Sequence, residues 1–291
     1  MNFVRFVRFV AYRAMRFSYL AGSIHPAYAQ GTSASISGVP SESLRKPVAF
    51  DWARRSAWVE GALLGGTVLS FAGAQFVPQY RGSVGPDSAH AFERTANNNS
   101  YASVGFAFGL STAYYLLVAN QIISFGYSNS QSYWMALPTI LSDVEAVLVA
   151  SSVTDVLKSR VGRCRPRAWQ DGYCHSNLDE NYKAFPSNHT AIPAALAGVQ
   201  LVLLLSDPSL TNAGFLTGFE LATMTTAYLR VKAGAHSWTD VGAGFALGHI
   251  AGIAIGMIHP QIAIEKKNYG VSLLPTSIHF DGKSVSIGGA F

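Results

Sequence analysis

A series of helix-length apolar segments begins near residue 57 and constrains the fold more than any other feature of the sequence. We place six of them, at 57–76, 103–125, 133–157, 190–205, 212–229 and 241–258. The stretch 79–100, which contains three consecutive asparagines, is expected to be a polar loop between the first two. The pattern predicts an all-α protein in which residues 57–258 form a six-helix bundle.

The composition falls between that of a soluble protein and that of a membrane protein. Charged residues make up 13% of the 291 residues and hydrophobic residues 49%. The mean hydropathy of +0.21 is apolar for a soluble protein and mild for a chain that lies mostly in a bilayer. The net charge is +5, but no run of Lys and Arg interleaved with aromatic residues occurs outside 158–240 and the N-terminus. We therefore expect no nucleic acid among the partners.

Three short blocks rich in basic, imidazole and carboxylate residues lie where predicted helices begin or end. The first is KSRVGRCRP from Lys158, the second is FPSNHT from Phe185, and the third is RVKAGAHSWTD from Arg230. They adjoin the end of the third helix, the start of the fourth, and the junction of the fifth and sixth. The blocks are therefore expected to gather at one end of the bundle.

The third block contains the residue types of a nucleophilic site. His236 and Asp240 are four residues apart and would share one face if this segment is helical. The carboxylate would then accept a hydrogen bond from one imidazole nitrogen and leave the other as an unprotonated nucleophile.

The other two blocks supply groups that bind anions. Ser187, Asn188 and His189 precede an apolar run, where the N-terminus of a helix offers unpaired backbone N–H groups. Gly162 is expected to end the third helix and to place Arg165 in a loop. With Lys158 and Arg230, Arg165 would bring three cations to one dianion.

The three blocks resemble the motifs of the type 2 phosphatidic acid phosphatase and vanadium haloperoxidase superfamily. Its pattern is Lys, six residues, Arg-Pro; then Pro-Ser-Gly-His; then Ser-Arg, five residues, His, three residues, Asp. All three motifs occur here in that order, and the matching residues are Lys158, Arg165, Pro166, Pro186, Ser187, His189, Arg230, His236 and Asp240. Two positions depart from the pattern. Asn188 replaces Gly and keeps the backbone N–H, whereas Leu229 replaces Ser and removes a hydroxyl.

The resemblance implies a metal-independent phosphatase that acts on phosphate monoesters or diphosphates of lipids or small molecules. His236 would attack phosphorus and form a phosphohistidine, Asp240 would orient His236, and His189 would protonate the leaving oxygen and then activate water. The residues expected to hold the phosphoryl oxygens are Lys158, Arg165, Arg230, Ser187 and, through its backbone N–H, Asn188. No cofactor is expected, and the sequence shows no evident metal site.

Two other functions fit the same residues. The first is a vanadate-dependent haloperoxidase that uses the same anion site. The second is a catalytically silent envelope protein that binds phosphorylated lipid headgroups, with Asn188 and Leu229 as signs of lost activity. Intact His189, His236 and Asp240 argue against the silent protein.

The N-terminus resembles an export signal. Arg5, Arg8, Arg13 and Arg16 precede a short apolar stretch at 17–24, and Ala-Tyr-Ala follows at 27–29. We expect cleavage after residue 29, with an uncleaved amphipathic anchor as the alternative. Residues 30–56 are rich in Ser, Gly and Pro and are expected to form a linker.

Only two cysteines are present, Cys164 and Cys174, and the loop that contains Arg165 lies between them. A close pair in an exported protein suggests a disulfide, and the alternative is two free buried thiols.

The C-terminal segment 259–291 changes character. Residues 271–274, 277–280 and 285–287 alternate as strands do, around an Asp-Gly pair at 281–282. We expect a short β-hairpin tail.

The location of the site depends on how many helices span a bilayer. A span needs about 20 largely apolar residues. Segments 103–125 and 241–258 meet that need, whereas 133–157 carries three acidic residues. If the signal is cleaved and all six helices span, the site loop lies in the cytoplasm. An external site requires an uncleaved N-terminus or helices that do not all span. We expect the bacterial cell envelope, either the inner membrane with the site facing the periplasm or a soluble or peripheral periplasmic protein.

Overall fold

The computed structural model describes residues 57–82, 84–88, 91–124, 128–175, 178–259, 277–280 and 285–288. The chain divides into two units, Met1–Arg45 and Lys46–Phe291, and every helix described here belongs to the second. The predicted signal or anchor at 1–29 and the predicted linker at 30–56 lie outside the described residues.

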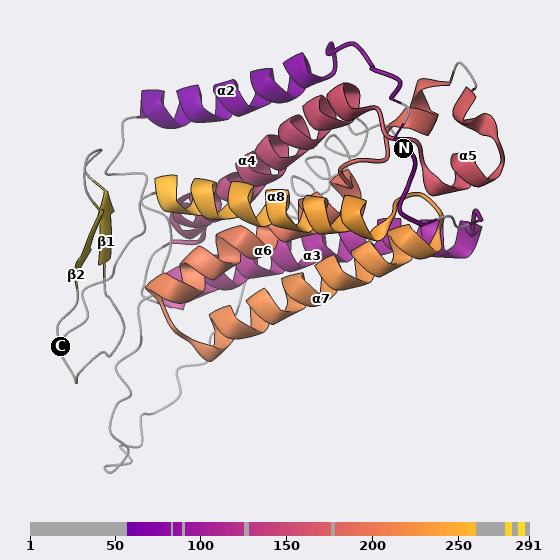
Figure 1. Ribbon diagram of the computed structural model, residues 1–291. Coiled ribbons are helices and arrows are strands. Elements are labelled where there is room, and N and C mark those ends of the chain that lie inside the picture. The colour runs from indigo at the N-terminus through magenta and orange to yellow at the C-terminus, as the bar shows by residue number, and fades with distance from the viewer. Residues whose placement is uncertain are drawn as a thin grey trace, which may run out of the picture. The chain divides into compact units, whose positions relative to one another are not determined.

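The described residues between 57 and 259 are all-α, with six long helices, as predicted (Figure 1). The long helices are α2 (Ala57–Ala74), α3 (Arg94–Ser124), α4 (Asn129–Val161), α6 (Asn188–Ser206), α7 (Leu210–Lys232) and α8 (Trp238–Ile258). Between α4 and α6 lie a short helix and two 3-10 turns, namely α5 (Pro166–Gln170), η2 (Tyr173–His175) and η3 (Asp179–Tyr182).

Helix α3 begins at Arg94, so the prediction of a polar loop over 79–100 is wrong for its last seven positions, 94–100. The reason is that polar side chains of the first turns bind a buried cation rather than water. Asn97 Oδ1 and Ser100 Oγ accept hydrogen bonds from Arg230 Nη1 at 2.8 and 3.3 Å. A polar stretch next to a buried charge can therefore be helical.

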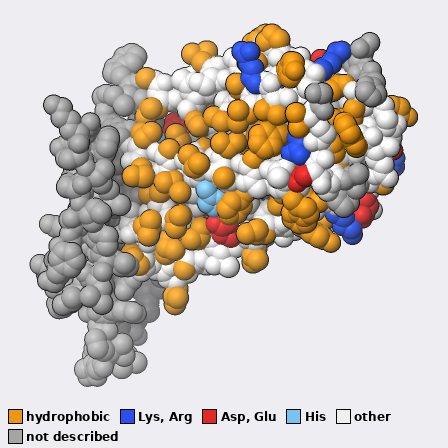
Figure 2. Space-filling model, in the orientation of Figure 1, with side chains coloured by type: hydrophobic (Ala, Val, Ile, Leu, Met, Phe, Trp, Pro, Cys, Tyr) orange, Lys and Arg blue, Asp and Glu red, His pale blue; other side chains and the backbone are white. Residues whose placement is uncertain are grey.

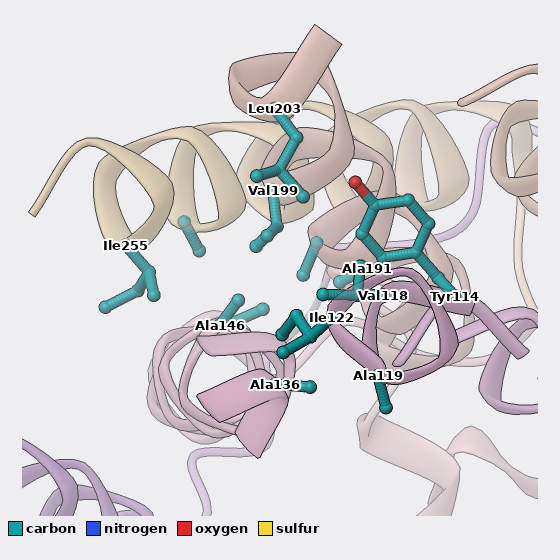
Figure 3. Packing of buried hydrophobic residues seen from close by; sticks show 13 residues of the cluster. Tyr114, Val118, Ala119, Ile122, Ala136, Ala146, Ala191, Val199, Leu203 and Ile255 are labelled. Atoms are coloured by element: carbon teal, nitrogen blue, oxygen red, sulfur yellow. The ribbon is translucent and has the colours of Figure 1, made fainter. Parts of the chain in front are cut away.

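Helix α6 is the centre of the bundle and contacts α3, α4, α7 and α8. Figure 3 shows Val199 and Leu203 of α6 between Ile255 of α8 and Tyr114 of α3, all members of one buried cluster. Burying an aliphatic side chain of this size stabilises a fold by roughly 1.5–3 kcal/mol. The core therefore fixes α6, whose first turn carries predicted site residues.

Helices α6 and α8 are in backbone contact along a row of glycines. A Cβ atom added at Gly244, Gly248 or Gly252 of α8 would collide with a carbonyl oxygen of α6 or of the residue that precedes it. The opposing carbonyls belong to Ser187, Ala191 and Ala195, one helical turn apart. Since only glycine permits this approach, the row sets the register between the two helices.

The C-terminal residues that the structure describes form the predicted hairpin. Strand β1 (Ser277–Phe280) pairs antiparallel with β2 (Val285–Gly288), with Ser277 opposite Gly288 and Phe280 opposite Val285. The predicted strand at 271–274 and the Asp-Gly turn at 281–282 lie outside the described residues.

The flanks of the bundle are apolar. Figure 2 shows hydrophobic side chains spread along the helices, whereas most charged side chains on this face lie toward the end that holds α5 in Figure 1. Among the helices that the structure describes, three are long and apolar enough to cross a membrane, namely Arg94–Ser124, Asn188–Ser206 and Trp238–Ile258. The surface therefore fits association with a membrane.

Candidate active site

The predicted site residues come together from six parts of the chain, namely α4, the loop that carries Arg165, the start of α6, α7, the connection after α7, and α8. Lys158 lies in the last turn of α4 and Arg230 in the last turn of α7. His189 lies in the first turn of α6, and His236 lies in the connection between α7 and α8. These positions are all helix ends or connections, as the sequence predicted.

Gly162 ends α4 and turns the chain toward the site, which confirms the predicted helix stop. Its φ of +59° lies in the left-handed region, where residues other than glycine are strained. Its N–H donates to the Lys158 carbonyl at 3.0 Å, and a Cβ atom there would collide with the Tyr80 carbonyl oxygen. The next residues, Arg163 to Arg165, are thereby directed back across the end of the bundle.

The imidazole of His236 is buried, at 1% exposure. Its Nδ1 lies 2.6 Å from the carbonyl oxygen of Ala184. Because a carbonyl only accepts, Nδ1 carries the proton and Nε2 keeps its lone pair. The imidazole is therefore held in the tautomer in which Nε2 can act as a nucleophile.

Asp240 is not the hydrogen-bond partner of His236, contrary to the sequence expectation. Its Oδ2 lies 3.9 Å from His236 Nδ1 and accepts instead from the Ser237 backbone N–H at 2.7 Å. Its Oδ1 pairs with Arg163 Nη1 at 3.0 Å. The physical reason is that α8 begins only at Trp238, so His236 precedes the helix and the two residues do not share a helical face. Asp240 is part of the capping box of α8.

Lys158 and Arg165 are largely buried cations with partial ion pairing. Lys158 Nζ lies 3.3 Å from Asp155 Oδ1, and Arg165 Nε donates to the Glu180 carbonyl at 2.8 Å. Burial lowers the pKa of Lys158 to about 8; Asp155 opposes the shift, and the nearby charges of Arg165 and Arg230 add to it. Both arginines are therefore near enough to Lys158 to act on its charge.

Arg230 is the most deeply buried of the three cations, at 3% exposure. Its Nη1 binds Asn97 and Ser100, but its Nε is buried and has no hydrogen-bond partner among the described residues. A buried N–H donor without a partner costs about 1–3 kcal/mol. This donor is suited to an oxygen of a bound anion.

The cation cluster also acts on the imidazoles. Burial, and then the charges of Arg230, Arg165 and Lys158, lowers the pKa of His236 well below its ordinary range. The neutral form of His236 is therefore favoured, which keeps its Nε2 lone pair available.

The start of α6 presents further donors. Ser187 Oγ accepts from Thr190 Oγ1 at 3.1 Å, which leaves its own hydroxyl proton available. Asn188 directs its side chain to α4, where Oδ1 accepts from Thr154 Oγ1 at 3.0 Å. As the first residue of α6, Asn188 has a backbone N–H with no partner inside the helix.

Tyr101 of α3 is a neighbour of the site that the sequence did not reveal. Its ring lies edge-on to that of His189, with centroids 4.7 Å apart, and the Arg230 guanidinium lies 5.8 Å from its centroid. The side chain is 56% exposed, so it lies at the surface side of these two residues. No sequence signal distinguishes it from the other aromatic residues of α3.

The loop that carries Arg165 is closed by the predicted disulfide. Cys164 and Cys174 are bonded, with Cα atoms 6.1 Å apart, and the Tyr182 hydroxyl donates to the Cys174 carbonyl.

Among the described residues, no group of three His, Cys, Asp or Glu side chains is placed to hold a metal ion.

Fold and site together define an α-helical protein in which two imidazoles and three cations gather at one end of the bundle. Residues 139–262 match the family model described as the PAP2 superfamily, which confirms the predicted superfamily. The matched segment covers all three motif blocks. Searches of curated proteins and of solved structures found no match.

Proposed function

We propose that this protein is a phosphatase that hydrolyses phosphate monoesters or diphosphates through a phosphohistidine, without a metal ion. The observation that carries the proposal is the unpartnered Nε of buried Arg230 beside a neutral His236. Three converging cations without an equal number of carboxylates favour a dianion. The superfamily match supports a phosphatase-type or haloperoxidase-like function for this segment.

In the first step, His236 Nε2 attacks phosphorus while the bond from phosphorus to the leaving oxygen breaks. The leaving oxygen takes a proton from His189. The imidazole of His236 becomes positive, and the hydrogen bond from Nδ1 to the Ala184 carbonyl, 2.6 Å long, strengthens as that charge develops. The bound dianion offsets the cations around His189 and so favours its protonated form.

In the second step, neutral His189 takes a proton from water, and the resulting hydroxide attacks phosphorus. The bond from phosphorus to Nε2 breaks, inorganic phosphate leaves, and His236 returns to its neutral form. Lys158, Arg165 and Arg230 stabilise the phosphoryl oxygens throughout, each charge-assisted hydrogen bond contributing roughly 1.5–3 kcal/mol. Ser187 and the Asn188 backbone N–H complete the anion site.

The substrate class follows from the setting of the site. The apolar flanks and the three long apolar helices favour a membrane-associated protein, so a phosphorylated lipid is a natural substrate and a small ester a second one.

We place the site in the periplasm of a bacterial cell envelope, because its loop carries a disulfide. Alkylation of unreduced protein in intact cells, followed by mass analysis, tests the compartment. Two alkylated cysteines would place the site in the cytoplasm.

The chemistry is tested by trapping the intermediate. The full chain, purified in detergent with a chelator, is mixed with an aryl phosphate labelled at phosphorus, whose leaving oxygen needs no proton, and is quenched in alkali, in which phosphohistidine survives. We expect label on the wild type, none on His236→Ala, and increased label on His189→Ala. His249→Gln is the matched control, because this imidazole pairs with Glu220 at 2.8 Å away from the cations. Turnover by His236→Ala at the wild-type rate would rule out the mechanism.

A further inference from the structure

Arg163 lies two residues before Arg165, and its side chain is tied to two segments around the site, residues 84–88 and the start of α8. Its Nε donates to the Gly85 carbonyl at 3.0 Å, its Nη2 pairs with Asp87 at 3.0 Å, and its Nη1 binds Asp240 at 3.0 Å. The side chain is 11% exposed. None of these partners belongs to the anion site, so the guanidinium is used within the protein.

The backbone of Arg163 reaches His236 by a second route. Its carbonyl oxygen accepts from the Ala184 N–H at 3.1 Å, and the Ala184 carbonyl in turn accepts from His236 Nδ1 at 2.6 Å. One residue therefore holds both groups next to the imidazole. The backbone fixes the carbonyl that selects the tautomer, and the side chain fixes the Asp240 carboxylate at 3.9 Å.

We propose that Arg163 is a positioning residue for His236: it holds the Ala184 carbonyl and the Asp240 carboxylate in the arrangement that keeps Nε2 neutral and aimed at the anion site. This inference rests on the proposed function for its kinetic consequences, but not for its electrostatic ones. A displacement of a reacting group by about 1 Å can cost roughly a hundredfold in rate.

The electrostatic part of the inference follows from the charges around His236. Those that face it are Lys158 from α4, Arg165 from the loop, His189 from α6, Arg230 from α7 and Asp240 from α8. Among these groups, Asp240 is acidic. Its negative charge is stabilised by Arg163 and by the Ser237 N–H, and the nearby charge of Asp87 opposes it. Without Arg163, the carboxylate is free to attract a proton to the imidazole.

The test compares Arg163→Gln, Arg163→Lys and the wild type. We expect Arg163→Gln to lose about tenfold or more in kcat with KM and the inhibition constant of vanadate within about threefold, because the three cations of the anion site are unchanged. The acid limb of kcat/KM should move to higher pH, and Arg163→Lys should restore it. Arg81→Gln is the control for loss of an arginine, since Arg81 pairs with Asp179 at 2.9 Å on the surface.

A measurement independent of activity separates this inference from the proposed function. NMR titration of the His236 ring should show a higher pKa in Arg163→Gln than in the wild type, whether or not the protein hydrolyses esters. If Arg163→Gln does not fold, Asp87→Asn takes its place, and the His236 pKa should then stay or fall, because a negative charge beside Arg163 is lost. An unchanged pKa and kcat in Arg163→Gln, or a raised pKa in Asp87→Asn, would overturn the inference.

Discussion

His236 donates its Nδ1 proton to the backbone carbonyl of Ala184 and not to the carboxylate of Asp240. The tautomer of the imidazole is thus selected by a group that no side-chain substitution removes. The Asp240 carboxylate accepts a hydrogen bond from the Ser237 N–H and pairs with Arg163. Asp240 therefore supports the connection between α7 and α8 and balances the charge of Arg163.

This arrangement predicts that Asp240→Asn loses less activity than it would if Asp240 were the hydrogen-bond partner of the His236 imidazole. The amide oxygen can still accept from the Ser237 N–H, so we expect about a tenfold loss in kcat and little loss of stability. Asp240→Ala removes the N3 carboxylate of the capping box, whose N-cap is Ser237, and should also lower the free energy of unfolding by about 1 kcal/mol. Steady-state kinetics and denaturant unfolding check both. Equal behaviour of the two variants would contradict this role.

If His189 protonates the leaving oxygen, the effect of His189→Ala should depend on the leaving group. With an alkyl phosphate, whose leaving oxygen needs the proton, we expect a loss of about a hundredfold or more. With p-nitrophenyl phosphate the first step should survive, giving a burst of nitrophenol followed by slow turnover. Stopped-flow absorbance measures the burst. The same loss on both substrates without a burst would exclude this role for His189.

The buried Lys158 predicts an alkaline limit to activity. Because its pKa is lowered to about 8, the ammonium is present below that pH and is lost above it. We expect kcat/KM to fall as pH rises above about 8, mainly through KM. Lys158→Arg stays charged and should move this limb upward. The pH profiles of kcat/KM are measured for the wild type and for Lys158→Arg. If both fall at the same alkaline pH, Lys158 is not the group that sets the limit.

Vanadate separates the phosphatase from the haloperoxidase. As a phosphate analogue that accepts a fifth ligand, it should inhibit competitively with the ester substrate. We expect negligible oxidation of bromide by the vanadate-loaded protein with peroxide, because we assign the site to ester hydrolysis. Halide oxidation assays on the same preparation provide the check. Sustained bromination with no ester hydrolysis would reverse the assignment.

The glycine row predicts opposite effects at two nearby positions of α8. Gly244→Ala would bring a Cβ atom into the Ser187 carbonyl, and we expect a loss of about 1–3 kcal/mol of stability together with reduced activity. Gly242→Ala meets no atom within 4 Å and should raise stability by roughly 0.5–1 kcal/mol. Thermal and denaturant unfolding of the two variants test the difference. A Gly244→Ala protein as stable as Gly242→Ala would show that the contact can relax.

The sequence could predict what depends on local pattern. The lengths of the apolar segments predicted the six helices, and Gly162 predicted the end of α4. The positions of the motifs at helix ends predicted that Lys158, His189 and His236 lie at one end of the bundle. These features follow from periodicity, from a φ that favours glycine and from short motifs.

The sequence could not predict what depends on tertiary contacts. The Ala184 carbonyl is a backbone group, and nothing in the side chain marks it as the partner of His236. The start of α3 at Arg94 depends on a cation supplied by α7. Arg163 stood inside the first motif block, but its partner Asp87 lies far away in the sequence. In each case the deciding partner is distant along the chain.

The backbone contact between α6 and α8 also limits how the site can change. Because Gly244 packs against the carbonyl of Ser187, the residue that precedes α6, the two helices cannot slide or separate without moving the anion site itself. The two helices therefore form a rigid side of the anion site, because the glycine row fixes the distance between them. For the phosphatase proposed above, we expect adaptation to leaving groups of different size to involve the disulfide-closed loop and Tyr101 instead.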